Sequence, residues 1–527
     1  MGFKVAFIGA GSVGFTRRLT LDLLGVPAFA DLEIAYMDIS ESNLDMVYQL
    51  ARRDIEAAGL KQVRLTRTLD QRAAIKGAKY VINVARVGGL EAFQSDIDVP
   101  LKYGIDQCVG DTLCAGGIMY GQRGIPYILQ ICKDIREVAV PGCRLLNYGN
   151  PNAMLTWAAN EFGGVETIGL CHGVIGGHWQ IANALGLPMK DVEIICAGIN
   201  HQTWYISVKH KGEDLTGKIL AAFEKDPNLS QTEKVRIDML RRFGYYSTES
   251  NGHLSEYVAW YRKREKEITD WIDLGVWING ETGGYLRVCT EGRNWFETEF
   301  PQWMQSPPLP IGPEHRGHEH GSYILEGLET GRVYRGHFNV VNQGCISNLP
   351  ADCIVEVPGY VDYNGINIPR VGDLPMGCAA VCAASVTVQR LAVHAAVKGD
   401  DLLLRQSFMM DPLTGAVCTP PEIWQLVDEM LVTQSKWLPQ YRKASAAAKQ
   451  RLAAAKAAGT LIATRQGYQG AARLHTRTVA EMAADRDAAN KQAGEADKAL
   501  ARPAAKGKSK AKAPMAGPAA KKAAKTR

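Results

Sequence analysis

The stretch KVAFIGAGSVG, residues 4–14, is a short apolar strand that runs directly into three glycines. The glycines have the spacing G-x-G-x-x-G, which lets the backbone turn tightly and approach a pyrophosphate at the N-terminus of the next helix. A second apolar run, 32–37, is followed by Asp38, whose carboxylate can accept a hydrogen bond from a ribose 2'-hydroxyl. The pattern therefore predicts an NAD site whose cofactor contacts come from Gly9, Gly11, Ser12 and Asp38.

Strand-like runs alternate with helical patterns through the first 170 residues. The strand-like runs are 3–8, 32–37, 80–84, 144–147 and 167–170, and the helical patterns include 42–58 and 125–138. Such alternation predicts an α/β fold with a parallel, doubly wound sheet of Rossmann type. Because ligands bind outside the carboxyl ends of such strands, we expect the polar segments that follow them to meet at one cleft.

The sequence changes character near residue 190, and four regions are expected. Residues 1–190 form the NAD-binding domain, and residues 191–442 form an α+β domain that binds substrate and metal. The second domain opens with a predicted hairpin of 192–197 and 202–209 and continues through helical stretches and a long irregular region, rich in Gly and Pro, to about residue 377. Residues 443–502 are expected to be mainly helical, and residues 503–527 to be a disordered basic tail, because they cannot bury enough apolar surface to fold.

Composition narrows the class of protein. The formal net charge is +5, but residues 503–527 carry seven Lys and one Arg without an acid, so the rest of the chain is mildly acidic and no specific nucleic-acid partner is expected. Twelve cysteines are scattered without a C-x-x-C pair. The most apolar stretch, 376–388, is too short to span a bilayer. The sequence predicts a cytoplasmic enzyme with no membrane partner.

Two candidate metal ligands follow predicted strands. Cys171 comes directly after the run 167–170, and His201 comes shortly after the apolar run 194–199. A thiolate and an imidazole that meet there can bind a divalent ion, with the remaining positions open to water or substrate hydroxyls. From the pattern alone, a buried cysteine and a hydrogen-bonded core histidine are the alternative.

Several motifs occur together in the order found in one enzyme family. They are FIGAGSVGFTRRL (7–19), RVGGLEAFQSDIDVPLKYGI (86–105), GDTLCAGGI (110–118), NYGNPNAM (147–154), CHG (171–173), AGINHQTW (197–204), ESNGHLSEYVAW (249–260), NQGCISNLPADCIVEVP (342–358) and DPLT (411–414). With these motifs the chain resembles the NAD- and manganese-dependent glycosidases, glycoside hydrolase family four, from residue 1 to about 435.

The resemblance implies a lactate and malate dehydrogenase-like fold and hydrolysis of an α-glycoside with NAD and Mn²⁺, or another divalent metal, as cofactors. Most glycosidases use a pair of carboxylates, and this family is an exception. In its redox-assisted elimination, C3 of the sugar is oxidised, a base removes the C2 proton and the aglycone leaves. Water then adds at C1 and the hydride returns to C3. The alternative is an NAD-dependent dehydrogenase of a sugar or hydroxy acid on the same fold.

The resemblance also assigns roles to residues. Cys171 and His201 match the metal ligands, and Asn150 and Asn200 are expected to contact the substrate. His172 lies near the leaving group, either as general acid or as a group that orients a hydroxyl. The C2 base is expected at Tyr257, which shares a predicted helix face with two other polar residues, and a core aromatic is the alternative. A homo-oligomer is expected. The residues named here for catalysis, substrate and metal are Asn150, Cys171, His172, Asn200, His201 and Tyr257.

Residues next to the metal cysteine suggest the sugar. In the family, His after the cysteine is associated with unphosphorylated α-glycosides, so His172 predicts such a substrate. The following Gly173 favours an acidic sugar such as a glucuronide, with a galactoside as the alternative. The guanidinium groups of Arg86, Arg123 and Arg316 are candidates to receive a carboxylate, or each forms an ion pair instead.

Overall fold

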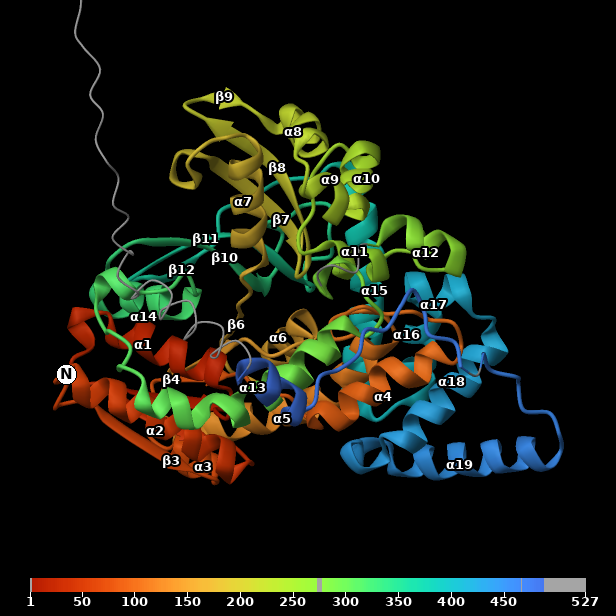
Figure 1. The fold of residues 1–527 in the computed structure, drawn as a ribbon, viewed down its shortest axis with the longest axis horizontal. Helices are drawn as coiled ribbons and strands as arrows, with labels where there is room; N and C mark the ends of the chain where they lie inside the picture. Colours follow the sequence, from red (N-terminus) through yellow and green to blue (C-terminus); the bar gives the residue numbers. More distant parts are fainter. Residues whose placement is uncertain (1, 273–276, 466, 488–527) are drawn as a thin grey trace, which may run out of the picture. The chain divides into compact units, whose positions relative to one another are not determined.

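The computed structural model describes residues 2–272, 277–465 and 467–487, and one mixed sheet organises them (Figure 1). Its first six strands are parallel and follow the order β3, β2, β1, β4, β5, β6. This order is that of a Rossmann fold, so the predicted doubly wound sheet is confirmed. The strands are β1 (Lys4–Ile8), β2 (Glu33–Met37), β3 (Arg64–Thr68), β4 (Tyr80–Asn83), β5 (Arg144–Asn147) and β6 (Thr167–Gly169).

The sheet continues past β6 as an antiparallel half. Asn339 of β10 lies opposite Gly169 of β6, and the order then runs β10, β11, β7, β8, β9, with β12 beside β11. The sheet is therefore continuous across the predicted domain boundary near residue 190. The strands are β7 (Glu193–Ile199), β8 (Gln202–His210), β9 (Glu213–Asp214), β10 (Tyr334–Val341), β11 (Ile354–Asp362) and β12 (Gly365–Asn367).

Helices flank both halves of the sheet (Figure 1). A short π-helical turn, η1 (Val13–Arg17), leads into α1. The α-helices are α1 (Arg18–Leu24), α2 (Glu41–Ala57), α3 (Gln71–Ile75), α4 (Gly89–Leu101), α5 (Cys114–Val138), α6 (Asn152–Phe162), α7 (Gly173–Ala184), α8 (Ile219–Lys225), α9 (Leu229–Thr232), α10 (Lys234–Phe243), α11 (Asn251–Tyr257), α12 (Glu265–Trp271), α13 (Gly284–Gln305), α14 (His320–Thr330), α15 (Met376–Lys398), α16 (Asp401–Met410), α17 (Pro412–Val417), α18 (Pro420–Thr433) and α19 (Arg442–Ala457).

The prediction of an irregular region extending to about residue 377 is wrong. The region contains α13, α14, β10 and β11. Glycine within these elements makes room for packing: a Cβ on Gly359 of β11 would lie 2.7 Å from the ring of Phe338 on the neighbouring strand. Here glycine marks close approach inside a sheet rather than a loop.

Both faces of the sheet are buried at β1, in the middle of the parallel half. Along β1, Ala6 and Ile8 belong to one hydrophobic core, and Val5 and Phe7 belong to a second core on the opposite face. All four side chains are fully buried, as expected for a parallel strand covered by helices on both sides. This packing fixes the carboxyl end of β1, from which the glycine loop starts.

Helix α15 is long and apolar. By length and composition it is the one helix of the described residues that could cross a membrane, and half of its most apolar window is buried inside the structure. It packs against α5, α6 and α16. A single helix of this kind is weak evidence for a membrane protein, because core helices have the same composition.

The C-terminal part of the chain returns to the body after α19. Residues 1–476 form one compact unit, and residues 477–527 form a second. Helix α19 ends at Ala457, the described residues from 459 to 477 carry no helix, and residues 479–487 are helical again, so the helical extension predicted over 443–502 is interrupted within the described residues. We call residues 460–474 the return segment. The predicted disordered tail, 503–527, lies outside the described residues.

Candidate functional site

The glycine loop and the end of β2 are joined by backbone and side-chain hydrogen bonds. The N–H groups of Gly9 and Ala10 both donate to the carbonyl of Met37. Asp38 Oδ2 accepts a 2.8 Å hydrogen bond from the Gly11 N–H, and a Cβ on Gly11 would lie 2.9 Å from that oxygen. Gly9 has a φ of +89°, and a Cβ there would meet Ala85 at 2.5 Å. The loop therefore requires glycine at both positions.

Ser12 directly precedes η1 and takes the N-cap position. The structure thus brings together all four residues predicted to contact the dinucleotide, Gly9, Gly11, Ser12 and Asp38, at the carboxyl ends of β1 and β2. Their arrangement matches the pyrophosphate and ribose positions of a Rossmann dinucleotide site.

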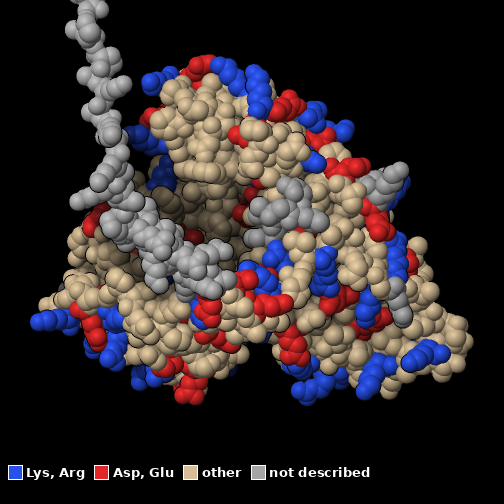
Figure 2. All heavy atoms as spheres, viewed as in Figure 1, with Lys and Arg blue, Asp and Glu red and all other residues tan. Residues whose placement is uncertain are grey.

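A cleft opens beside this loop. It has a volume of about 240 Å³, and the space-filling view shows the surface hollowed between α7 and α1 (Figure 2). The described residues that line it are Phe15, Asp111, Tyr148, Asn150, Leu170, Cys171, His172, His201, Glu249, His253, Ile278 and Tyr285. They come from both the parallel and the antiparallel half of the sheet, so the cleft forms only when the two halves are folded together.

Cys171, His201 and Glu249 bring three ligand types to one point in this cleft. His201 Nε2 lies 3.1 Å from Cys171 Sγ and 3.1 Å from Glu249 Oε2, and the thiol lies 3.9 Å from the same carboxylate oxygen. The structure therefore brings the two predicted ligands together. It also adds Glu249, which the sequence analysis did not assign to the metal site.

Local structure explains how the first two reach this point. Cys171 stands between the end of β6 and α7, where the parallel strand delivers it to the ligand-binding edge of the sheet. Asn200 and His201 form the two-residue turn between β7 and β8, and His201 has a φ of +61°. A positive φ is uncommon for a residue with a side chain and occurs disproportionately at functional sites.

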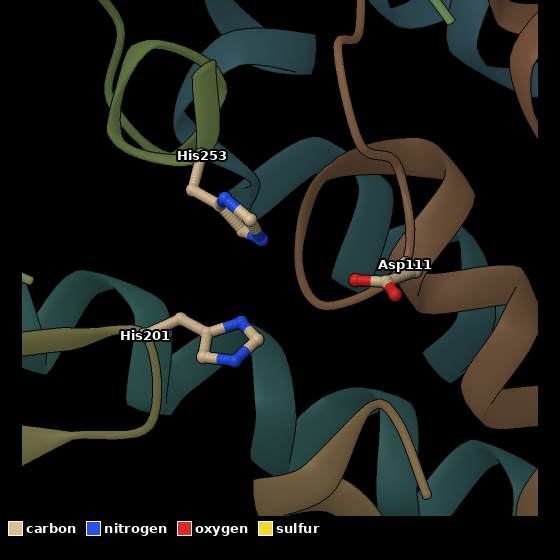
Figure 3. Close-up of side chains that lie close together, drawn as sticks. All are labelled: Asp111, His201 and His253. Atoms are coloured by element: carbon tan, nitrogen blue, oxygen red, sulfur yellow. The ribbon is translucent and has the colours of Figure 1, made fainter. Parts of the chain in front are cut away.

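A second group of side chains faces the other edge of the His201 ring. Asp111, His201 and His253 point toward one another from the loop before α5, the β7–β8 turn and α11 (Figure 3). Ligand atoms of the three lie within 4.8 Å of one another. Asn150 Nδ2 donates to Asp111 Oδ2 over 3.0 Å, so the predicted sugar contact Asn150 lies in the cleft beside this carboxylate.

Two of the residues predicted for catalysis, substrate and metal do not line the cleft. Asn200 is fully buried and donates a hydrogen bond to Glu356 Oε2 over 3.2 Å. It also contacts the Cys171 thiol, so it packs against a proposed metal ligand without reaching the cleft itself. Tyr257 is also buried, with its hydroxyl 3.5 Å from His201 Nδ1. His253, one helical turn earlier in α11, does line the cleft.

His172 lies at the mouth of the cleft. Its side chain is 63% exposed, and its Nδ1 lies 3.7 Å from Glu319 Oε1. Burial raises the pKa of the Glu319 carboxyl. The sequence analysis did not single out Glu319, because nothing in the spacing of GHEHG indicates that this loop reaches the end of β6.

Burial governs the protonation of the buried groups. Burial and then the Glu249 carboxylate raise the pKa of the Cys171 thiol well above its ordinary value. Burial also lowers the pKa of His253 to about 4, which leaves its imidazole neutral at pH 7. For Glu249, burial raises the pKa, but the Coulombic effect of the neighbouring His and Arg side chains outweighs it and lowers the value to about 2. A thiolate at Cys171 thus requires a cation beside it.

None of the described residues that line the cleft is Lys or Arg. Arg123 is buried in an ion pair with Asp96, and Arg316 pairs with Glu326. Arg86 stacks on three aromatic rings, one of them Tyr285, and its Nη2 lies 3.8 Å from Asp111 Oδ2. The three arginines considered as carboxylate receptors are therefore all engaged with protein groups.

The fold and the site together are those of an enzyme that works with a dinucleotide and a divalent cation. Residues 4–187 match the family model described as family 4 glycosyl hydrolase, and residues 196–414 match the family 4 glycosyl hydrolase C-terminal domain. The chain belongs to the family 4 glycosyl hydrolases. The prediction of a glycosidase is confirmed, and the dehydrogenase alternative is not favoured.

Relatives whose names state an activity are glycosidases as well. An α-galactosidase of Rhizobium meliloti (strain 1021) is 57% identical over 492 residues, which cover 93% of this chain and 99% of that protein. An α-galactosidase of Bacillus subtilis (strain 168) is 32% identical, with 83% of this chain and 100% of that protein covered. Among solved structures, the putative glucosidase LplD from Bacillus subtilis has a TM-score of 0.71 and 26% identity, covering 82% of this chain and 100% of that one.

Proposed function

We propose that this chain hydrolyses unphosphorylated α-galactosides, with NAD on the glycine loop and Mn²⁺ held by Cys171, His201 and Glu249. The observation that carries the proposal is the meeting of these three side chains in a cleft beside the glycine loop. The 57% identity to an α-galactosidase over almost the whole chain supports the same activity. A solved 6-phospho-α-glucosidase with 18% identity and a TM-score of 0.68 was crystallised with NAD and Mn²⁺, which supports the fold but not the sugar.

The residues present fit a divalent cation. His201 Nε2 and Glu249 Oε2 face each other at 3.1 Å, with Cys171 Sγ 3.1 Å from the same nitrogen. A cation between the three groups would satisfy an imidazole lone pair, a carboxylate and a thiolate together. Three protein ligands leave positions open for substrate oxygens, as a catalytic site requires.

When bound, NAD supplies a reversible hydride acceptor and Mn²⁺ a Lewis acid. The protein's own side chains orient the substrate and transfer protons. Asn150 and Asp111 hydrogen-bond to each other at the cleft wall and orient the sugar hydroxyls. His172, at the mouth, donates a proton to the departing aglycone oxygen or positions it.

We place the C2 base at His253 rather than at the predicted Tyr257, because His253 lines the cleft. Its Nδ1 is 2.6 Å from Ser250 Oγ, which leaves Nε2 toward the cavity. Once C3 is a ketone, Nε2 takes the C2 proton. The C–H electron pair then forms a C1–C2 double bond as the C1–O bond breaks.

In D₂O we expect deuterium at C2 of the product from wild type and Tyr257→Phe, and strongly reduced turnover and exchange in His253→Ala. Normal exchange in His253→Ala would refute this assignment.

A neutral sugar is favoured by the charges of the cleft. Asp111 and Glu249 line it, Glu319 stands beside its mouth, and no described lining residue carries a guanidinium or ammonium group. A uronate or a phosphate would meet carboxylates there without a guanidinium or ammonium group among the described lining residues to pair with it. We therefore propose the galactoside rather than the glucuronide of the two sugars considered from the sequence.

The test is hydrolysis of p-nitrophenyl α-galactoside, α-glucoside and α-glucuronide with NAD and Mn²⁺ omitted singly and a reductant present. We expect release from the galactoside that needs both additions and no net accumulation of NADH. Accumulation of NADH without release of aglycone would point to a dehydrogenase. Preference for the glucuronide would overturn the proposed sugar alone.

We also propose a cytoplasmic homo-oligomer. All twelve cysteines lie in the described residues and none of them forms a disulfide, which is consistent with a reducing compartment. Light scattering of the purified chain measures the number of subunits, and a monomer at working concentration would refute the oligomer.

A further inference from the structure

We propose that the exposed face of α7 is a binding subsite for the leaving group, on which Trp179 stacks against the distal sugar of an oligosaccharide α-galactoside. The inference rests on the proposed function, because it takes a galactoside as the substrate and the cleft as the place of cleavage. It adds that the chain prefers leaving groups of two or more sugars over short ones, and it names the side chains that recognise them.

The face begins at the mouth of the cleft. Helix α7 borders the hollow of the cleft (Figure 2), and its N-terminal end lies next to β6 (Figure 1). His172 is the N-cap of this helix and lines the cleft with its exposed side chain. Because an α-helix has about 3.6 residues per turn, positions 176, 179 and 183 lie on the same side of α7 as His172, and all three are exposed. The face therefore leads from the place of the leaving group outward along the surface.

Trp179 is the largest side chain on this face. It is 57% exposed, more than any other tryptophan of the described residues. Trp179 makes no ring contact, cation–π contact or hydrogen bond with a described residue. Three other tryptophans with a large exposed fraction each pack against a ring or a guanidinium group: they are Trp260 (with Phe243), Trp295 (with Trp303) and Trp424 (with Arg405). The indole of Trp179 is therefore free to stack on the apolar face of a sugar ring and to donate its N–H to a hydroxyl.

Single exposed apolar side chains are common on protein surfaces, so the position of Trp179 matters more than its exposure. Seven residues separate Trp179 from His172, which corresponds to about 10 Å along the helix axis. Aromatic side chains of helices lean toward the N-terminus of the helix, and this direction brings the indole back toward the cleft. A leaving group of one sugar stays beside His172, whereas a longer one reaches the indole.

Two adjacent glycines of α7 have different surroundings. A Cβ on Gly177 would lie 2.2 Å from the Tyr205 hydroxyl, so glycine at 177 is required for packing. A Cβ on Gly176 would meet no atom within 4 Å, so packing does not explain glycine at 176, although glycine weakens a helix relative to alanine. The bare backbone at 176 leaves open space between His172 and Trp179, in which a sugar ring can lie against the helix.

The remaining chemistry of the face suits a neutral, hydroxyl-rich ligand. Asn183 lies one turn beyond Trp179, and its exposed side-chain amide forms no hydrogen bond with a described residue. An amide group offers two donors and an acceptor to sugar hydroxyls. Helix α7 contains no Lys, Arg, Asp or Glu along its length. A face with an indole, an amide and no charge matches a distal sugar better than an anion.

The experiment compares full-length wild type with Trp179→Ala, Trp179→Phe and Gly176→Leu, in the presence of NAD, Mn²⁺ and a reductant. The substrates are p-nitrophenyl α-galactoside, melibiose and raffinose, whose leaving groups are nitrophenol, glucose and sucrose. Trp424→Ala is the matched control, because Trp424 is a partly exposed tryptophan of α18 that does not line the cleft. We measure kcat and KM from the release of nitrophenol or galactose, and the mass of each variant by light scattering.

Trp179→Ala should lower kcat/KM about 10-fold more for raffinose than for p-nitrophenyl α-galactoside, mainly through KM, because a stacking contact with the distal sugar is lost. Gly176→Leu should have the same selective effect, since its side chain fills the space between His172 and Trp179. Trp179→Phe keeps an aromatic ring and should retain most of the preference, and Trp424→Ala should leave the ratio of the two kcat/KM values unchanged.

The wild-type ratio in Trp179→Ala or in Gly176→Leu would overturn the subsite. A smaller mass of Trp179→Ala than of wild type would also overturn it, because a second copy of the chain would then cover the indole. A failure of the proposed function gives a different result. Wild type that cleaves p-nitrophenyl α-galactoside but not raffinose refutes the subsite alone, whereas wild type that cleaves none of the three substrates refutes the galactosidase and the subsite with it.

Discussion

A Cβ on Gly173 would lie 2.8 Å from Oε1 of Glu249, so the missing side chain at position 173 is the space that this carboxylate occupies. Glu249 uses that space to reach His201 at 3.1 Å. The sequence interpretation connected Gly173 with an acidic sugar. The structure supplies a different physical reason for glycine at this position. It makes room for Glu249 at the metal site and does not depend on which sugar is bound.

Gly173→Ala should therefore weaken Mn²⁺ binding by about 10-fold or more, because the added methyl group pushes the Glu249 carboxylate away from the thiol and imidazole. Gly176→Ala is the control in the same helix, since a Cβ at 176 meets no atom within 4 Å. Mn²⁺ affinity is measured for both, with the thermal midpoint to monitor folding. Equal affinities in the two variants would contradict the role given to Glu249.

His172→Ala should reveal how the leaving group is assisted. If His172 donates the proton, kcat/KM should fall about 10²–10⁴-fold for an α-galactoside with an alkyl leaving group and far less for the p-nitrophenyl galactoside. The reason is that p-nitrophenolate leaves without protonation. Equal losses for the two substrates would instead show that His172 only positions the aglycone.

Asp428 links three helices and should matter for stability in a pH-dependent way. Its carboxylate accepts hydrogen bonds from Arg405 of α16 and Arg451 of α19. Burial raises the pKa of Asp428, but these hydrogen bonds outweigh burial and lower the pKa below its ordinary value. A lowered folded-state pKa gives stability that is present above the unfolded pKa, near 4, and is lost as pH falls through the folded value.

Asp428→Asn should accordingly lower the free energy of unfolding by roughly 3 kcal/mol at pH 7. The difference from wild type should shrink as the pH is lowered below about 4. Asp352→Asn is the control, because its pair with Arg390 is exposed and should contribute at most about 1 kcal/mol. Thermal midpoints between pH 7 and pH 3.5 check this, and a difference that does not change with pH would refute it.

The return segment should be required for activity although it lies beyond both family domains. The Ala471 N–H donates to Asp106 Oδ2, the Thr282 N–H donates to the Ala472 carbonyl, and Arg473 pairs with Asp98 at 2.7 Å. Asp106 begins the loop that leads to Asp111.

Ending the chain after Gly459 should lower the thermal midpoint and abolish most turnover, whereas ending it after Thr476 should leave kcat/KM close to wild type. The comparison separates loss of the return segment from loss of residues 477–527. Full activity of the shorter chain would show that the loop holds its position without these contacts.

The parallel half of the fold could be predicted because its strands are continuous apolar runs that stop at polar residues. Strand β3 was missed, since Arg64–Thr68 is an edge strand with largely exposed, polar side chains and lacks that signal. The antiparallel strands β10 and β11 were missed because their glycines were interpreted as loop residues, whereas Gly359 accommodates a neighbouring ring.

The same reasoning applies to the site. Cys171 and His201 each follow a strand and carry a metal-binding group, but the pattern left a buried cysteine and a core histidine as the alternative, and the resemblance to the family was needed to assign them to the metal. Glu249 comes from a loop and has no periodic relation to either, so only folding places it next to them.

The contacts of the return segment also bear on when the enzyme becomes active during its synthesis. A nascent chain that has already left the ribosome as far as residue 414 contains both family domains, yet it lacks the residues that tie down Asp106 and Thr282. We expect the working cleft to form only after the C-terminal residues emerge, so that incomplete translation products do not hydrolyse substrate.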